Sequence, residues 1–291
     1  MDNVNEFFAT LSSCLWGWPM IVLLLGTHVF LTIRLRFPQR KLFTAIRLSV
    51  QRDKSQKGDV SQFGALATAL AATIGTGNII GVATAVALGG PGAVFWCWLT
   101  GVFGISTKYS EALLAIKYRV KSESGRMQGG PMYTLERGLG WRKMGILFAV
   151  FTAIAAFGIG CTVQANAIST IMYASYGIST ELSGGVLMLL AAAVIIGGVR
   201  SISKVCSMLV PFMALLYVLG CVYILYVNAV YVAPALQLIV SSAFSPEAAG
   251  GGFAGSTVIM AARYGIARGL FSNESGLGSA PIVAAAARTK N

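Results

Sequence analysis

Two short stretches place glycines and polar side chains in the middle of segments that are otherwise apolar. The first, TIGTGN, covers residues 73–78, and the second, SNESGLG, covers residues 272–278. Glycine is less favourable than alanine in a helix interior by about 1 kcal/mol. Asn and Glu are costly at membrane depth and are usually functional there. Both stretches therefore predict a helix that is interrupted near its centre.

A break at membrane depth frees backbone N–H and C=O groups, and each unsatisfied group costs several kcal/mol in hydrocarbon. The N-terminus of one half-helix presents N–H groups and a positive dipole end to an anion, and the carbonyls of the other half suit a cation. An amino-acid carboxylate together with a sodium ion would satisfy both. Close helix packing through small residues is the alternative, and it stays open above all for GTGN.

The composition places these breaks in a membrane protein. The chain has 291 residues, of which 56% are hydrophobic and 11% charged, and its mean hydropathy is +0.72. Soluble globular proteins carry about 25% charged residues. Residues 61–107 contain no charged side chain, and Glu181 is the only one between 144 and 199. Such apolar runs are long enough to span a bilayer, which predicts an all-α, polytopic membrane protein.

The positive charge is gathered in short loops between the apolar runs. Of the Lys and Arg residues that contribute to the net charge of +12, many lie in residues 34–60 and 119–143. Basic loops mark the cytoplasmic side of a membrane protein, whereas nucleic-acid binding belongs to soluble domains with a basic face. We therefore expect these two loops in the cytoplasm, the N-terminus outside, a plasma-membrane location and no nucleic-acid partner.

The apolar runs predict one transmembrane domain with the following organisation. An extra N-terminal helix covers residues 14–33, and a basic loop with an amphipathic helix follows at 34–60. Five helices occupy 61–228 (spans near 62–88, 91–118, 144–174, 182–199 and 206–228). An extracellular loop, in which PALQLIVSSAF is an interfacial or re-entrant helix, covers 229–255, and a second repeat begins at 256–287. The first interrupted span starts inside and the second outside, as in inverted-topology repeats.

The remaining reactive side chains do not predict catalysis or a metal centre. The five cysteines fall in or beside apolar spans and read as small buried hydrophobes. His28, the only histidine, reads as a packed or lipid-facing residue of the first span. Since the membrane segments hold no Ser/His/Asp set and no paired carboxylates, we do not expect an enzyme. No cofactor is expected.

The sequence resembles the alanine/glycine:cation symporters, also called sodium:alanine symporters. The resemblance covers nearly the whole chain and is strongest in four motifs: LATALAATIGTGNIIGVATAVALGGPGAVFW (66–96), GGPMYTLERGLG (129–140), VQANAI (163–168) and RGLFSNESGLGSAP (268–281). It implies a leucine-transporter-like fold with two inverted five-helix repeats. In this chain the extra N-terminal helix, the first repeat and the first, broken helix of the second repeat would be present.

The resemblance also implies roles for individual residues. Amides of Thr76 and Gly77 would hold a substrate carboxylate, and the Thr73 carbonyl its ammonium group. The substrate pocket would further comprise Asn78, Gln164, Phe271, Ser272, Asn273 and Gly276. The sodium site would comprise Ala71, Ile74, Asn78 and Ser272, where Na+ is the coupling ion and not a resident metal. For Ile74 and Phe271, a packing role stays open.

Glu274 has no counterpart in the unwound helices of the related neurotransmitter sodium symporters. Three roles stay open: a helix-cap or gate partner of Arg263 or Arg268, a polar bridge to other helices, or a proton or ion site. Arg263 and Arg268 would lie in the outer half of the last span, lining a vestibule or reaching toward the surface.

The function implied is sodium-coupled symport of alanine, and of glycine as the second substrate, by alternating access. Its partners are the small amino acid, Na+ and the lipid bilayer. The alternatives are proton-coupled amino-acid transport and a truncated, non-transporting remnant, because family members continue through four more helices of the second repeat. A channel would need a continuous polar path instead of two local breaks.

Overall fold

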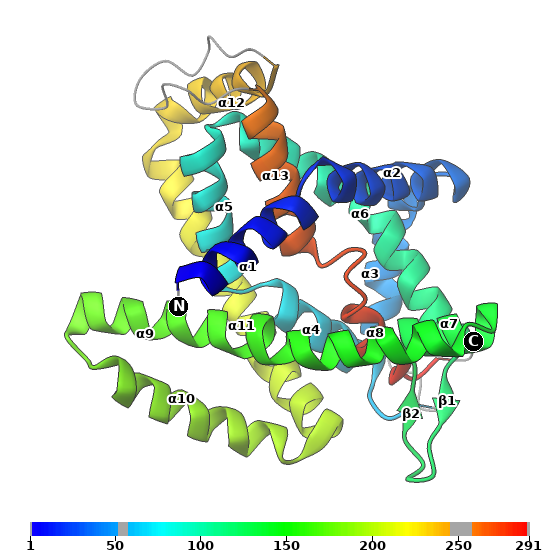
Figure 1. Cartoon of the computed structure of the whole chain (residues 1–291). Helices are drawn as coiled ribbons and strands as arrows, with labels where there is room; N and C mark the ends of the chain where they lie inside the picture. Colours follow the sequence, from blue (N-terminus) through cyan, green and yellow to red (C-terminus); the bar gives the residue numbers. More distant parts are fainter. Residues whose placement is uncertain (1, 52–57, 245–257, 290–291) are drawn as a thin grey trace. The chain divides into compact units, whose positions relative to one another are not determined.

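A computed structural model describes residues 2–51, 58–244 and 258–289 of the chain (Figure 1). The helices are α1 (Asp2–Leu15), α2 (Trp18–Arg34), η1 (Pro38–Lys41), α3 (Leu42–Val50), α4 (Gln62–Thr73), α5 (Thr76–Gly89), α6 (Gly92–Lys117), α7 (Pro131–Leu139), α8 (Arg142–Ala155), the π-helical η2 (Ala156–Thr162), α9 (Val163–Tyr176), α10 (Thr180–Ile195), α11 (Gly198–Val227), α12 (Ala229–Phe244), α13 (Val258–Asn273) and α14 (Ala280–Ala285). Within these ranges the single sheet is an antiparallel hairpin of β1 (Val120–Lys121) and β2 (Met127–Gln128).

The prediction of an all-α membrane protein is confirmed. Four helical stretches are long and apolar enough to cross a bilayer: Val4–Arg34, Gln62–Gly89, Arg142–Tyr176 and Gly198–Val227. Few of their residues are buried in the isolated chain, and many of their large apolar side chains are exposed. Exposure of so many large apolar side chains is expected when lipid is the solvent, and a soluble monomer avoids it.

Two predicted segment ends differ from the structure because glycines end the helices elsewhere. The first span was predicted from residue 14, but α1 ends at Leu15 and α2 begins at Trp18, after Gly17 adopts an extended backbone. The fifth span was predicted to end at 199, but α10 ends at Ile195. Gly198, with a φ of +68°, then starts α11, so that Arg200 lies inside a helix and not in a loop.

Other predicted segments keep their place but gain detail. The amphipathic segment in the first basic loop is helical as η1 and α3. The second basic loop folds into the hairpin of β1 and β2, followed by α7. In the predicted extracellular segment 229–255, α12 occupies Ala229–Phe244, so the helix expected at PALQLIVSSAF begins earlier than predicted. The extracellular placement of this segment stays a prediction. The rest of that segment and the predicted start of the last span at 256 lie outside the described residues.

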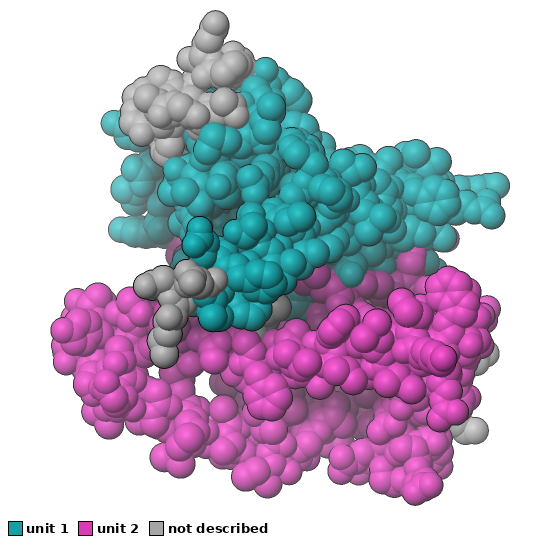
Figure 2. All heavy atoms as spheres, viewed as in Figure 1, with its two compact units in different colours: residues 1–40, 80–109, 222–276 teal, residues 41–79, 110–221, 277–291 magenta. Residues whose placement is uncertain are grey.

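The chain divides into two compact units, which are coloured separately in Figure 2. Unit 1 comprises residues 1–40, 80–109 and 222–276. In unit 1, α13 packs against α2 through a buried cluster of Ile21, Ala262, Ile266 and Leu270. On another side, a Cβ added at Gly265 would lie 2.7 Å from the Trp96 Cβ of α6. Glycine thus lets α6 and α13 approach more closely than side chains allow.

Unit 2 comprises residues 41–79, 110–221 and 277–291. In this unit α14 packs against α4 and β2, α7 against α8, and α9 against α10. The N-terminal half of α4 faces α11, where a Cβ added at Gly64 would lie 3.5 Å from the Ser207 hydroxyl oxygen. Ser61 caps α4 by accepting a hydrogen bond from the Gly64 N–H at 3.0 Å. Such a cap is typically worth about 1 kcal/mol.

Candidate functional site

The first predicted break is present, between α4 and α5. Helix α4 ends at Thr73, and Ile74 leaves the helical region with φ −90° and ψ 92°. Helix α5 begins again at Thr76. The break is shorter than GTGN suggested, because Gly77 and Asn78 already belong to the first turn of α5.

The short length of this break follows from Asn78. Its side-chain amide nitrogen donates a hydrogen bond to the Thr73 carbonyl, and its backbone N–H donates to the Gly75 carbonyl at 3.1 Å. The amide therefore bridges the end of α4 to the start of α5. The Thr73 carbonyl, which the resemblance assigns to a substrate ammonium, accepts this bond in the structure. A carbonyl oxygen has two lone pairs and can accept a second hydrogen bond.

The N-terminus of α5 carries the two amides that the resemblance assigns to a carboxylate. Thr76 and Gly77 are the first two residues of this 14-residue helix. The first four N–H groups of a helix have no partner within it, and the positive end of the helix dipole lies there. An anion is therefore favoured at this position.

Gln164 lies beside the first break, within unit 2. A Cβ added at Gly75 would lie 3.4 Å from the Gln164 amide nitrogen and 3.5 Å from its amide oxygen. Gln164 is the second residue of α9 and directly follows the π-helical segment η2. Single π-helical turns occur frequently at functional sites. The structure thus brings Gln164 to the break, where the resemblance implies it.

The second predicted break is also present, between α13 and α14. Helix α13 ends at Asn273, and α14 begins at Ala280. Within the break, Glu274, Gly276 and Gly278 have φ values of +51°, +88° and +78°. Phe271, Ser272 and Asn273 form the last turn of α13, so their carbonyls lie at the negative end of a helix, which favours a cation.

The part of the second break that lies in unit 1 is closely packed. Ser275 is 1% exposed, and a Cβ added at Gly104 of α6 would lie 2.9 Å from its hydroxyl oxygen. The same Cβ would lie 3.8 Å from the amide nitrogen of Asn273. Among the residues the structure describes, that nitrogen is buried without a hydrogen-bond partner. Asn273 is thus an unpaired donor at the helix end where the sequence predicts a ligand.

The predicted sodium ligands are divided between the two units. Ala71, Ile74 and Asn78 belong to unit 2, at the C-terminal end of α4 and the start of α5. Ser272 belongs to unit 1, in the last turn of α13. Each group provides the carbonyl end of an interrupted helix, the element of a broken helix that suits a hard cation.

The structure describes one contact of each of the two arginines of α13. The Arg263 guanidinium lies 5.9 Å from the centre of the Tyr264 ring, in a cation–π contact. A Cβ added at Gly81 of α5 would lie 3.8 Å from the Arg268 Cδ, so the Arg268 stem passes over this glycine. A gate role for Glu274 stays a prediction. The structure adds that the Glu274 backbone has a positive φ.

His28 is a residue at this site that sequence reasoning missed. It is fully buried, and its ring nitrogen Nδ1 forms a 2.7 Å hydrogen bond with the Thr107 hydroxyl of α6. A Cβ added at Gly276 would lie 3.9 Å from its Cε1. The only signal in the sequence was a polar residue inside an apolar span, which did not reveal the neighbours of the side chain.

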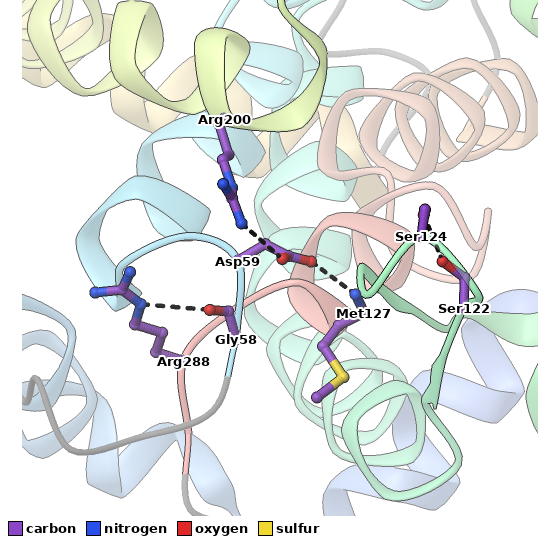
Figure 3. Close-up of polar contacts among 7 residues, drawn as sticks. All are labelled: Gly58, Asp59, Ser122, Ser124, Met127, Arg200 and Arg288. Carbon is purple, nitrogen blue, oxygen red and sulfur yellow. Dashed lines mark hydrogen bonds and ion pairs between the residues drawn. The ribbon is translucent and has the colours of Figure 1, made fainter.

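A polar network in unit 2 anchors the segments that flank both breaks (Figure 3). Asp59 precedes α4, and its carboxylate accepts a 2.7 Å hydrogen bond from the Met127 N–H of β2. The other carboxylate oxygen lies 3.6 Å from the Arg200 guanidinium of α11. The Arg288 side chain, beyond α14, donates to the Gly58 carbonyl at 3.4 Å. The start of α4 and the segment after α14 are thereby held together.

Arg119 completes this network from the end of α6. Its guanidinium donates to the carbonyls of Ala285, Ala287 and Thr289 at 3.1, 2.8 and 3.2 Å. Burial lowers the pKa of Arg119, and the negative charge of Asp59 acts in the opposite direction. Because arginine stays protonated in proteins, the guanidinium remains a charged hydrogen-bond donor to the C-terminal end of α14.

Replacing Asp59 should show how much this network stabilises the fold. The Asp59 side chain is 6% exposed and that of Arg200 is 76% exposed. Asp59→Ala removes the hydrogen-bond partner of the partly buried Met127 N–H, so we expect the free energy of unfolding to fall by about 2 kcal/mol. Arg200→Ala removes an exposed partner and should change it by less than about 1 kcal/mol. Thermal unfolding of the purified variants in detergent measures both, and equal losses would contradict this assignment.

Comparison with known proteins agrees with these features. The family model described as "Sodium:alanine symporter family" matches residues 1–291. A Methanococcus maripaludis protein named sodium/alanine symporter AgcS is 52% identical over 296 residues, covering 99% of this chain and 64% of that protein. A Haemophilus influenzae protein named as an uncharacterized transporter is 52% identical over 290 residues, with coverage of 99% and 64%.

A further relative differs in the coupling ion that its name gives. A Bacillus subtilis protein named putative sodium/proton-dependent alanine carrier protein YrbD is 40% identical over 286 residues, covering 98% of this chain and 58% of that protein. The chain thus spans less than two thirds of the length of these relatives. Since the family model covers every residue and the interrupted helices lie where the family motifs lie, the chain belongs to the sodium:alanine symporter family.

Proposed function

We propose that the protein carrying this chain is a secondary active transporter that couples uptake of alanine to sodium across the plasma membrane, with glycine as the second substrate. The observation that carries this proposal is the pair of interrupted helices, α4–α5 and α13–α14, in a chain of this family. Interrupted helices are the elements with which many secondary transporters bind substrate and ion. The name of the relative AgcS supports alanine and sodium.

The first break would bind the substrate carboxylate. The amides of Thr76 and Gly77 open α5 and point along its axis at the positive dipole end. Gln164 borders the same break and would close the pocket with its side-chain amide. The glycines and short side chains of residues 73–78 favour a small amino acid as the substrate.

The second break would complete the pocket and contribute to the ion site. Phe271 and Asn273 would line the substrate, while Ser272 would join the carbonyls of Ala71 and Ile74 around sodium. This arrangement supports the leucine-transporter-like organisation of two inverted repeats, with residues 61–228 as the first. The N-terminus outside and the basic loops 34–60 and 119–143 in the cytoplasm complete this proposal.

Uptake of labelled alanine into liposomes tests the proposal. The full-length protein is reconstituted, and an inward sodium gradient, an inward proton gradient or no gradient is imposed in parallel. Stimulation by sodium alone supports sodium symport. Stimulation by protons favours the proton-coupled alternative, to which the name of the relative YrbD points. An uptake rate that neither gradient changes would contradict secondary active symport.

Gln164→Ala should weaken alanine binding without unfolding the protein. The variant removes the side-chain amide beside Gly75, and a lost hydrogen bond of about 1 kcal/mol corresponds to a roughly fivefold higher KM. Gln237→Ala, on the exposed surface of α12, is the matched control and should leave the KM unchanged. Equal KM values for the two variants would remove Gln164 from the pocket.

A further inference from the structure

Helix α3 is exposed along almost its whole length. None of its nine residues, Leu42–Val50, is buried, and all of them except Ser49 are exposed. An isolated helix of this length is marginal in water, because most helices in proteins are stabilised by an amphipathic face that packs against something else. No described part of the chain buries a residue of α3, so its stability requires a further surface.

One face of α3 is an apolar stripe. Phe43, Ile46 and Val50 follow one another at intervals of three and four residues, which places them on the same side of a helix. They are 84%, 53% and 62% exposed. Leu48, two residues after Ile46, lies on the opposite side of the helix. Soluble surfaces avoid large exposed apolar side chains that lie together, so such a stripe indicates contact with an apolar partner.

Helix α3 lies at the end of a membrane-spanning stretch. With its amide oriented so that the nitrogen meets these oxygens, the Gln62 side chain donates to the carbonyls of Leu48 at 2.7 Å and Gln51 at 3.2 Å. These bonds tie the C-terminal end of α3 to the first residue of α4. Gln62 also begins the stretch Gln62–Gly89, which is long and apolar enough to cross a bilayer. The apolar stripe is therefore held at the level where this stretch enters the membrane.

The charge of the segment that contains α3 has one sign. Residues 34–51 include five basic residues and no acidic residue. Lys41 directly precedes α3 and Arg47 lies within it, and both are exposed. Basic residues near a membrane surface are attracted to anionic headgroups. A second copy of the chain would bring the same positive charge to a two-fold contact and would be repelled. An anionic membrane surface therefore complements both the charge and the apolar stripe of α3.

We propose that α3 is a binding site for anionic phospholipids at the membrane surface. The apolar stripe inserts among the lipid chains, and Lys41 and Arg47 bind the headgroups, as in other amphipathic helices that lie in the membrane plane. Arg47 follows Phe43 by four residues, so its alkyl stem runs beside the stripe while its charge reaches the headgroups. Because Gln62 ties α3 to α4, the lipid contact also anchors the first half of the first interrupted helix. This inference goes beyond the proposed function and does not depend on the substrate.

Hydrogen–deuterium exchange of the full-length protein in lipid nanodiscs tests this proposal. One preparation contains phosphatidylcholine alone, and the other contains phosphatidylcholine mixed with the anionic phosphatidylglycerol. The amides of residues 42–50 should exchange about tenfold more slowly in the anionic nanodiscs, because the headgroups add to the binding of α3. High salt should remove this difference, since it screens exposed charges. Both faces of a nanodisc carry the same lipids, so the result does not depend on the orientation of the protein.

Variants separate the two parts of the contact. Lys41→Gln combined with Arg47→Gln should abolish the difference between the two nanodiscs. Ile46→Ser should speed exchange of residues 42–50 in both, because it breaks the apolar stripe. Leu48→Ser is the matched control, since Leu48 is 53% exposed like Ile46 but lies on the opposite side of α3. It should keep the wild-type difference. Unchanged exchange in α10 shows that each variant is folded.

Three results would overturn the proposal. The first is equal exchange of residues 42–50 of the wild type in the two nanodiscs, which excludes a contact with anionic headgroups. The second is an equal effect of Ile46→Ser and Leu48→Ser, which excludes insertion of the apolar stripe. The third is protection in detergent that rises with protein concentration, which assigns this face to a second copy. If the wild type shows no gradient-driven alanine uptake, the proposed function fails, while the exchange comparison still decides the role of α3.

Discussion

Replacing Gly265 with alanine is expected to lower the free energy of unfolding by about 3 kcal/mol. Gly265 lies in α13, where an added Cβ would overlap the Ala93 carbonyl oxygen of α6 and lie 2.7 Å from the Trp96 Cβ and 3.0 Å from the Ala93 carbonyl carbon. Two of these atoms are backbone, so relief requires α6 and α13 to separate. Overpacking typically costs 1–3 kcal/mol, and a backbone clash lies at or above the upper end of that range.

The melting temperature in detergent measures this effect. A loss of about 3 kcal/mol corresponds to a decrease of roughly 5 °C or more for a chain of this size. Gly26→Ala is the matched control in the same unit, because an added Cβ at Gly26 of α2 meets nothing within 4 Å. Alanine there should be neutral or slightly stabilising, since it is the better helix former. If the Gly265→Ala variant has the same melting temperature as the control, α6 and α13 do not pack as closely as the structure indicates.

Gly276→Ala is expected to lower the affinity for alanine by at least tenfold. Gly276 has a φ of +88°, and a left-handed backbone costs a residue with a Cβ about 1–2 kcal/mol. The added Cβ would also lie 3.1 Å from Leu24 Cδ2. Both effects push the break out of its shape, and the carbonyls of the last turn of α13 move with it. Binding of labelled alanine to the full-length protein in detergent measures the loss.

A second glycine provides the control for backbone strain alone. Gly177, which follows α9, has a φ of +67°, and an added Cβ there meets nothing within 4 Å. Gly177→Ala should therefore lower the melting temperature by a similar amount and leave alanine affinity unchanged. Adding Leu24→Ala to Gly276→Ala relieves the side-chain contact and should restore part of the affinity. If the Gly177 and Gly276 variants bind alanine with equal affinity, the shape of the second break does not affect alanine binding.

Much of the fold was predictable because its signals are local. Charge-free apolar runs predicted the membrane helices, and paired glycines among polar residues predicted both interruptions, at Ile74–Gly75 and after Asn273. Each of these signals depends on the solvation and backbone energetics of neighbouring residues. The helix ends at Leu15 and Ile195 were less predictable, since single glycines such as Gly17 and Gly198 compete there with continuous apolar patterns.

The extent and the surroundings of the breaks depended on contacts between distant residues. Local sequence predicted an unwound GTGN, but the Asn78 amide bonds to the Thr73 carbonyl and returns Thr76–Asn78 to a helix. Gln164 could be assigned to the first break only through family resemblance, and its place beside Gly75 is a tertiary contact.

The amino-acid sequence by itself determined that this chain lies in a membrane and where its helices are interrupted, because transfer from water to lipid and the helix propensity of glycine act residue by residue. Only the tertiary structure decided what borders the interruptions. His28 forms a hydrogen bond with Thr107, which is 79 residues away in the sequence, and lies beside Gly276, which is still further away. Such pairs form because packing of whole helices brings them together, and no periodicity within one helix encodes which partner a buried polar atom will face.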